Sequence, residues 1–332
     1  MGHMMRRSFI WLGTFLFILV LSLPVASQQD PHKGPAFSDP SAVQKMPQEW
    51  KERSITYPES AGKADLVINL NQQLYPLLVP MVEDYAQEHE LKIAYSEGTC
   101  GKSAGMLERK EVDMGGLCCP PGELDRLPGL KYHTIGIMPL GILVHPDNPV
   151  EDLTLQQVRS IFAGDIKRWS EVGGRDELIQ VIASLHCKKR PGHWRLLLPN
   201  EDAFSTSMVV EGDMTDVIAI IGANPSSIGY ESLLTAERFV HRGKVKELKI
   251  NGTDPRNLND LATLRYPLYR VFSITTWEDE HTRTPHAQSL AQYLIKRTEE
   301  LEGIPSNFIP ASRLREAGWK FQGTELIGEP KK

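Results

Sequence analysis

The sequence predicts an α/β fold of two doubly wound lobes joined by two crossover strands. Short apolar strands alternate with helical segments along most of the chain, which is typical of parallel sheets covered by helices. The chain has 332 residues, and the roughly 300 that follow its N-terminal apolar segment favour two lobes over one core. Two extended apolar runs also contain candidate crossings between lobes, near residues 143 and 272.

The N-terminus has the pattern of an export signal. Arg6 and Arg7 precede an apolar run over residues 9–23, which proline and small residues then close. This pattern predicts a cleaved signal peptide over residues 1–27, and an uncleaved membrane anchor is the alternative because of the length of the run. Residues 28–64 are polar and read as an arm, either a tether or a segment lying on the surface. We expect a periplasmic or extracellular protein.

The charge of the chain is that of an ordinary acidic soluble protein. Removing the two arginines of the signal changes the formal net charge from −5 to −7. The chain has no long basic stripe and no interleaving of basic and aromatic residues, so we expect no nucleic-acid partner. A monomer is expected.

The first predicted lobe comprises residues 65–142 plus 274–325, and the second comprises residues 143–273. Thr154 is the predicted N-cap of a helix whose buried stripe begins at Leu155 and Val158. The other expected strands and helices of both lobes are strands over 65–70, 91–95, 112–117, 130–144, 179–183, 227–230 and 266–272, and helices over 75–89, 102–109, 213–223 and 286–301.

Residues 99–105 form a glycine-bearing loop that opens a helix. Cys100, Gly101 and Lys102 stand at this opening, where backbone N–H groups and the helix dipole favour a bound anion. The following strand ends in the adjacent pair Cys118 and Cys119. In a doubly wound sheet such positions lie at the ligand-binding edge.

Five segments in sequence order resemble phosphate-type periplasmic solute-binding proteins of ABC transporters. They are residues 74–77, 111–115, 153–174, 224–230 and 265–270, within a match from about residue 65 to residue 320. The resemblance implies the type 2 periplasmic binding protein fold, a small inorganic solute and delivery to the membrane subunits of a transporter. A sensor ectodomain is an alternative partner.

The ligand site of this chain departs from that family. Gln72 and Gln73 stand where the resemblance implies hydroxyl side chains, and Cys100 replaces a serine of the glycine loop. The arginine and Ser-Gly-Thr run expected in the second lobe is absent from its place. The segment over residues 186–194 stands there instead, and its candidate ligand-binding residues are Cys187, Lys188, Arg190 and His193.

All four cysteines fall where the resemblance places the cleft. One reading is structural disulfides, which exported proteins favour. The other is a thiol-lined site for a soft centre formed by Cys100, Cys118, Cys119 and Cys187. Such a centre would be a thiophilic metal, a metalloid oxyanion such as arsenite, or an iron–sulfur cluster held by thiolates. His186 and His193 are further ligand candidates, or ordinary loop histidines.

The basic residues beside Cys187 favour an anion or an anionic complex over a bare divalent cation as the ligand. The alternative is that they belong to a solvent-exposed basic loop with no ligand. The leading function is therefore an exported solute-binding protein, not an enzyme, with its ligand shifted towards thiol chemistry. The alternatives are a phosphate or oxyanion binder with structural disulfides, and a thiol-based redox enzyme. No C-x-x-C pair is present to support the last of these.

Overall fold

The computed structural model describes Met1, residues 32–303 and residues 307–331. Except for Met1, the predicted signal peptide lies outside this part of the chain. The α-helices are α1 Gln48–Glu52, α2 Tyr75–Glu88, α3 Cys100–Glu108, α4 Leu155–Ala163, α5 Met214–Ala223, α6 Leu233–Arg238, α7 Leu258–Ala262, α8 Pro285–Thr298 and α9 Ala311–Glu316. None of the helices in the described ranges is both long and apolar enough to span a bilayer.

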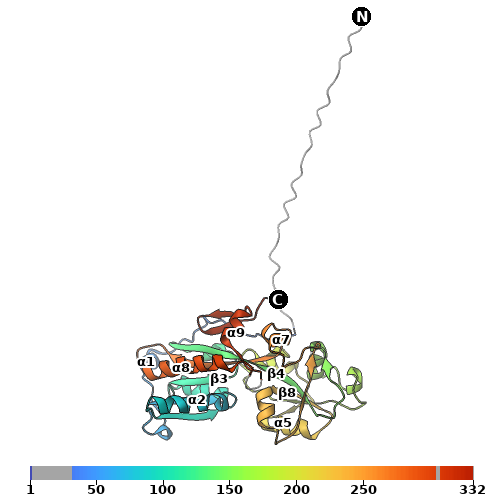
Figure 1. Cartoon of the computed structure of the whole chain (residues 1–332), viewed down its shortest axis with the longest axis horizontal. Helices are drawn as coiled ribbons and strands as arrows, with labels where there is room; N and C mark the ends of the chain where they lie inside the picture. Colours follow the sequence, from blue (N-terminus) through green and yellow to red (C-terminus); the bar gives the residue numbers. More distant parts are fainter. Residues whose placement is uncertain (2–31, 304–306, 332) are drawn as a thin grey trace. The chain divides into compact units, whose positions relative to one another are not determined.

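A mixed sheet runs through the molecule (Figure 1). Its strands follow the order β2-β1-β3-β11-β4-β8-β6-β7. The strands of this sheet are β1 Leu66–Asn71, β2 Ile93–Gly98, β3 Met114–Leu117, β4 Leu130–Val144, β6 Gln180–Ala183, β7 Val209–Val210, β8 Ser227–Ser232, β9 Lys246–Glu247, β11 Tyr269–Trp277 and β12 Ile309–Pro310. The remaining strands form two small pairs, β5 Asp152–Leu153 with β10 Lys249–Ile250, and β13 Lys320–Gln322 with β14 Glu325–Gly328.

The α/β fold with two crossover strands is confirmed. Strands β1, β2 and β3 pair in parallel, as do β6, β7 and β8. Between these groups, β4 pairs with β11 as far as Pro139 and with β8 from Leu140 onward. The pairings of β4 and β11 are antiparallel, so the expectation of a parallel sheet is wrong at its centre, where the two crossovers run in opposite directions.

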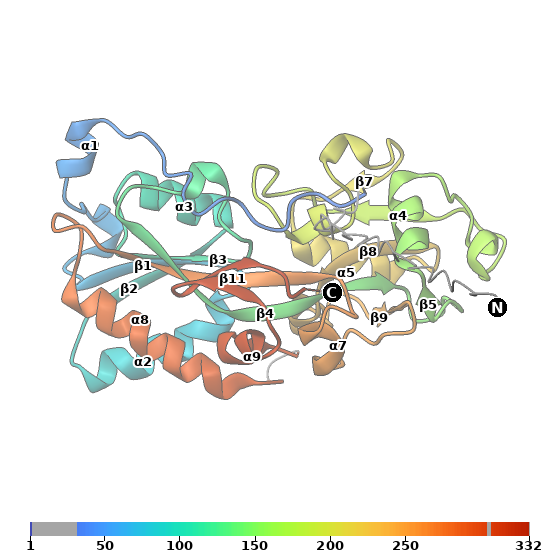
Figure 2. The same cartoon turned by 90° about the horizontal axis from the view of Figure 1, so that it is seen from above.

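Two hydrophobic cores define what we call lobe 1 and lobe 2. Lobe 1 contains β1–β3 with α2 and α8 on one face and α3 on the other (Figure 2), and its core includes Leu78 and Phe272. Lobe 2 contains β6–β8 with α4–α6, and its core includes Phe162, Trp194 and Tyr230. The sequence boundaries predicted for the lobes remain a prediction.

Several helix and strand ends differ from the sequence expectations. The helix expected from Lys102 begins at Cys100, because Thr99 is its N-cap and accepts a hydrogen bond from the Lys102 N–H. The run expected over 266–272 forms strand β11 only from Tyr269, after Pro267, and continues to Trp277. The N-cap predicted at Thr154 is confirmed by a capping box with Gln157.

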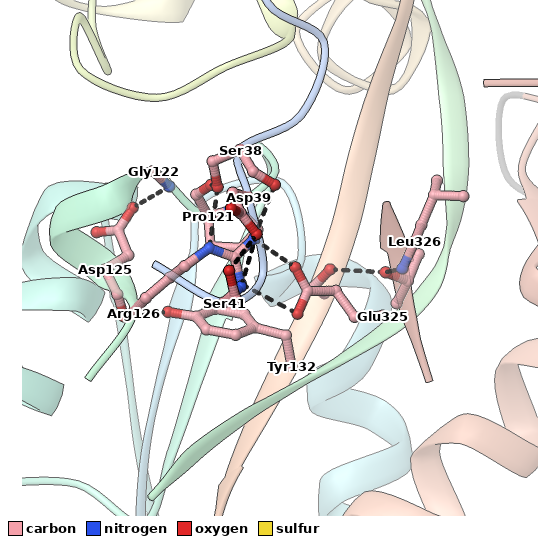
Figure 3. Close-up of polar contacts among 12 residues, drawn as sticks. Ser38, Asp39, Ser41, Pro121, Gly122, Asp125, Arg126, Tyr132, Glu325 and Leu326 are labelled. Atoms are coloured by element: carbon pink, nitrogen blue, oxygen red, sulfur yellow. Dashed lines mark hydrogen bonds and ion pairs between the residues drawn. The ribbon is translucent and has the colours of Figure 1, made fainter. Parts of the chain in front are cut away.

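The described part of the polar arm lies on both lobes. Its first contacts are with lobe 2, where the Gly34 N–H donates to the Arg195 carbonyl at 2.8 Å and the Gly192 N–H donates to the Pro35 carbonyl at 3.0 Å. The arm then reaches lobe 1, where Arg126 donates to Ser38 and pairs with Glu325 (Figure 3). The arm therefore bridges the loop that follows β6 and the loop that precedes β4.

Candidate ligand-binding site

Three thiols meet in the core of lobe 1. The sulfur atoms of Cys100, Cys118 and Cys119 all lie within 4.8 Å of one another, and the three side chains are at most 4% exposed. The sulfurs of Cys100 and Cys118 are 3.2 Å apart, and the Cys118 backbone N–H also donates to the Cys100 sulfur at 3.2 Å. The two motifs that the sequence singled out therefore form one cluster.

The local fold explains why these cysteines converge. Cys100 is the first residue of α3, which follows β2, while Cys118 and Cys119 follow the last residue of β3. Both β2 and β3 pair in parallel with β1, so their carboxyl ends lie at the same edge of the sheet. The cluster occupies the edge at which ligands bind in doubly wound folds.

Lobe 2 contributes a fourth thiol. Cys187 lies in the loop after β6, packs against the core of lobe 1, and is within hydrogen-bonding reach of Cys100 and Cys119. Its sulfur also lies 3.1 Å from Nδ1 of His186. The backbone of Cys187 has φ 60° and that of His193 has φ 56°. Left-handed backbone at residues other than glycine is uncommon and gathers at functional sites.

A buried ion pair borders the thiols. Arg270 of β11 donates to Glu231 of β8 at 2.7 Å, and both side chains are fully buried. Arg270 also approaches the Cys118 sulfur at 3.5 Å. Gln73, which follows β1, donates to Glu231 at 2.9 Å and thereby connects lobe 1 to lobe 2.

Sequence reasoning missed Arg270 and Glu231. Each is a charged residue inside a strand that is otherwise buried, and this was the signal that could have identified them. Charged residues are almost never fully buried unless they are paired.

Unpartnered polar atoms surround the cluster. Among the described residues, buried side-chain atoms without a hydrogen-bond partner include Nδ2 of Asn71, Oε1 of Gln73, Nε2 of His186, Oε2 of Glu231 and Nε of Arg270. Both ring nitrogens of His193 are also buried without a hydrogen-bond partner. The His193 ring stacks on the ring of His186, with the ring centroids 4.9 Å apart. Buried polar groups normally have partners, so their concentration here marks a place where a ligand is expected.

A cavity of about 40 Å³ lies between these groups. Its lining residues are Asn71, Gln72, Gln73, Gly98, Thr99, Cys100, Cys118, His186, Gly212 and Met214. The thioether of Met214 adds a further soft sulfur from lobe 2, at 3.4 Å from the Gln73 side-chain nitrogen. A space this small accommodates a few water-sized groups and excludes a drug-sized organic ligand.

The thiols differ in acidity because they hydrogen-bond to one another. Contact with Cys118 raises the pKa of Cys100 well above its ordinary value, and contact with Cys100 does the same to the pKa of Cys119. Donation from Cys100 lowers the pKa of Cys118, and donation from Cys100 and Cys119 lowers that of Cys187. Cys118 and Cys187 are therefore the more acidic thiols of the four.

The two histidines respond in opposite ways. Burial opposes the charged form of His186, but its hydrogen bond with Cys187 and its charge interactions with Cys187 and Cys118 together raise its pKa. Burial lowers the pKa of His193 well below its ordinary value. The rings of His186 and His193 stack on each other beside the thiols.

Other predicted site residues lie farther from the cluster or are engaged elsewhere. Gly101 and Lys102 are exposed on α3, and the Lys102 ammonium donates to the Glu97 carbonyl at 3.0 Å. Lys188 is exposed in the Cys187 loop. The structure does not bring Lys102 or Lys188 to the cavity lining, whereas Gln72 and Gln73 belong to it.

Arg190 connects the two lobes instead of lining the cavity. Its guanidinium donates two hydrogen bonds to the Asp125 carboxylate, at 2.6 and 2.7 Å, and both side chains are largely buried. Asp125 belongs to the short helix Glu123–Asp125, a few residues after Cys119. This bidentate pair holds the Cys187 loop of lobe 2 against the loop that follows the thiols of lobe 1.

All four cysteines are free thiols. The structure therefore does not contain the structural disulfides of the alternative reading.

Comparisons with known proteins agree with this architecture. A family model described as a PBP superfamily domain matches residues 56–298. The phosphate-binding protein PstS of Bacillus subtilis (strain 168) is 25% identical over 266 residues, which cover 79% of this chain and 82% of that protein. The chain therefore belongs to the PBP superfamily, and the predicted resemblance to phosphate-type periplasmic binding proteins is confirmed.

Two solved structures share the fold. An ABC-type phosphate transport receptor from Vibrio cholerae has a TM-score of 0.57 and 19% identity, covering 74% of this chain and 99% of its own. A putative phosphate ABC transporter substrate-binding protein with bound phosphate, from Clostridium perfringens, has a TM-score of 0.60 and 17% identity, with the same coverage. These relatives are named as receptors and binding proteins rather than enzymes, in line with the expectation for this chain.

Proposed function

We propose that this protein is an exported solute-binding protein that delivers a thiophilic solute to the membrane subunits of an ABC transporter. The observation that carries the proposal is the convergence of three buried thiols at the N-terminus of α3, at the ligand-binding edge of the sheet. The binding role and the periplasmic or extracellular location rest on membership of the PBP superfamily and on relatives named as transport receptors.

Soft sulfur ligands favour a soft centre. Thiolates and thioethers prefer thiophilic metals and iron–sulfur clusters to hard cations. Cys100, Cys118 and Met214 supply such donors around one small cavity, and Cys187 packs against the core beside it. A metalloid oxyanion is the third class of solute that suits converging thiols. In each case the solute is cargo rather than a resident cofactor.

Contacts from both lobes explain how binding would be coupled to closure. Cys100, Cys118 and Cys119 belong to lobe 1, whereas Cys187, His186 and Met214 belong to lobe 2. A solute held between them gains its full set of contacts only when the lobes are shut. Binding therefore selects the closed state by differential affinity.

Phosphate is the second candidate solute. The named relatives favour it, and so does the helix N-terminus at Cys100, whose backbone N–H groups suit an anion. Phosphate binding would need no thiol, so the two candidates make opposite predictions for cysteine variants.

The test is a binding titration of the reduced protein, purified without oxygen, together with elemental analysis and a free-thiol count. We expect a bound soft element or a soft-ion affinity that Cys100→Ser and Cys119→Ser weaken, while thermal melting shows that both variants remain folded. Lys188→Ala is the control, because Lys188 is exposed in the loop that contains Cys187 and its replacement should not alter soft-ion binding. Phosphate binding that is unchanged in every serine variant would refute the thiophilic proposal.

A further inference from the structure

We propose that the solute is a trivalent metalloid hydroxide, the neutral form of arsenite or antimonite, which Cys100, Cys118 and Cys119 bind as a trithiolate. This inference rests on the proposed function and narrows it to one class of solute. Three features of the site support it: the number of converging thiols, the charge balance around them and the separation of their sulfurs.

The number of thiols in the tight group is three. Cys100, Cys118 and Cys119 form the group in which all sulfurs lie within 4.8 Å, and all three come from lobe 1. Cys187 comes from lobe 2 and contacts His186 as well as the other thiols. Lobe 1 therefore supplies all three thiols for a trivalent centre, and lobe 2 adds polar contacts from His186 on closure, while a four-thiol metal site would need thiols from both lobes.

The buried charges near the cluster already balance. Arg270 pairs with Glu231, and Arg190 pairs with Asp125. A divalent cation bound by three thiolates would add a net charge of −1, and four thiolates would add −2, while Arg270 and Arg190 are already engaged by their own carboxylates. A trivalent centre bound by three thiolates is neutral, so it avoids the cost of an uncompensated buried charge.

The separation of the Cys100 and Cys118 sulfurs also fits a trivalent centre. In a tetrahedral zinc site, bonds of about 2.3 Å place neighbouring sulfurs about 3.8 Å apart. The sulfurs of Cys100 and Cys118 are 3.2 Å apart. The lone pair of a trivalent arsenic or antimony centre compresses its sulfur–centre–sulfur angles below the tetrahedral value, which brings sulfurs closer together.

The binding step is a condensation without oxidation or reduction. One E(OH)₃ molecule, where E is trivalent arsenic or antimony, reacts with three thiols to give E(SR)₃ and three water molecules. Three E–O bonds break, three E–S bonds form, and each thiol proton leaves on a hydroxide as water. The unpartnered atoms of Asn71, Gln73 and His186 lie at the same cavity and are placed to hydrogen-bond the arriving hydroxyl groups and the departing water.

The test compares sodium arsenite, cadmium and inorganic phosphate on the reduced full-length protein under oxygen-free conditions. With arsenite we expect one equivalent to bind, the free-thiol count to fall from four to one, and the intact mass to gain one arsenic atom less three hydrogens. Cys118→Ser should weaken arsenite binding more than about a hundredfold, beyond the loss typical of indirect partners. Cys187→Ser should keep the one-to-one stoichiometry and the same mass gain.

The outcomes separate this inference from the proposed function. One outcome is cadmium binding that consumes four thiols and requires Cys187, with no arsenite binding. This result refutes the inference of a trivalent solute but agrees with the proposed function of binding a thiophilic solute. Phosphate binding alone, indifferent to every cysteine, overturns both. Because the thiols are buried, the folding of each serine variant is first checked by thermal melting. The mass gain of Cys187→Ser is a second readout, and a folding defect in Cys118→Ser does not affect it.

Discussion

Replacing Glu231 with glutamine tests whether the buried ion pair at the site is as tightly balanced as the structure indicates. Glutamine has nearly the shape of glutamate but no charge, so Glu231→Gln leaves the Arg270 guanidinium buried without its counter-charge. Both side chains of the pair have no exposed surface. We therefore expect the full penalty of a buried charge rather than the small effect of a surface pair.

The size of the effect follows from the contacts that remain. Removing one partner of a buried pair costs about 3–5 kcal/mol. One oxygen of Glu231 accepts hydrogen bonds from Arg270, Gln73 and the Ser232 N–H, and a glutamine oxygen can keep these three. The loss should lie at the lower end, about 3 kcal/mol, which corresponds to a decrease of roughly 6 °C in melting temperature.

The assay is urea unfolding followed by tryptophan fluorescence, supported by thermal melting. Glu300→Gln is the matched control, because it makes the same substitution in the exposed pair Arg297–Glu300 and should cost less than about 1 kcal/mol. The double variant Glu231→Gln with Arg270→Met should recover part of the loss by removing the stranded charge. Equal stabilities for Glu231→Gln and Glu300→Gln would refute the reasoning.

Three further predictions concern the connection between the lobes, pH and the arm. Asp125→Asn removes the charge that holds Arg190 and should make separation of the two lobes easier by about 1.4 kcal/mol. Cys187 should then react with a thiol reagent about tenfold faster, and an unchanged rate would contradict this. Burial lowers the pKa of His133 from its ordinary 6.5 to about 4. Between pH 6.5 and pH 4, His133 therefore binds a proton in the unfolded chain but not in the folded protein. The free energy of unfolding should therefore fall by about 3 kcal/mol as pH drops from 6.5 to 4, and His133→Gln should flatten this dependence in urea titrations. Lys110 is fully buried and donates to two carbonyls of the arm. Lys110→Met should therefore make the arm sensitive to limited proteolysis while soft-ion binding persists. An arm that stays resistant to the protease would contradict this.

The sequence predicted much of the fold because local signals and packing agree. Strand β4 has the predicted limits, since its mostly apolar residues from Tyr132 onward are buried on both faces. Thr154 predicted the start of α4 as its N-cap, and the structure adds a capping box with Gln157. The antiparallel centre of the sheet was missed, because strand direction depends on how the chain returns from lobe 2, which local periodicity does not encode.

The candidate site was predicted in part for a related reason. Motif position identified Cys100, Cys118 and Cys119, which α3 and β3 bring to one edge of the sheet. Composition alone suggested that Lys188 and Arg190 face the ligand, yet Lys188 is exposed and Arg190 pairs with Asp125. The partner of a charged loop residue depends on tertiary contacts, here with a helix more than sixty residues earlier in the chain.

A thiol cluster can replace hydroxyl ligands at this position because cysteine serves two physical roles at once. Cys100, Cys118 and Cys119 belong to the hydrophobic core of lobe 1, where a free thiol packs as a small apolar side chain. Serine at the same buried positions would require a hydrogen-bond partner for each hydroxyl, whether or not a ligand were bound. The cysteines therefore allow the empty lobe to stay folded without polar ligand contacts, while still presenting soft donors when the solute arrives. If the proposed function holds, the change of ligand chemistry needs no change of scaffold, and the cost of the site falls instead on Asn71, Gln73 and His186, whose unpartnered atoms lie at the cavity.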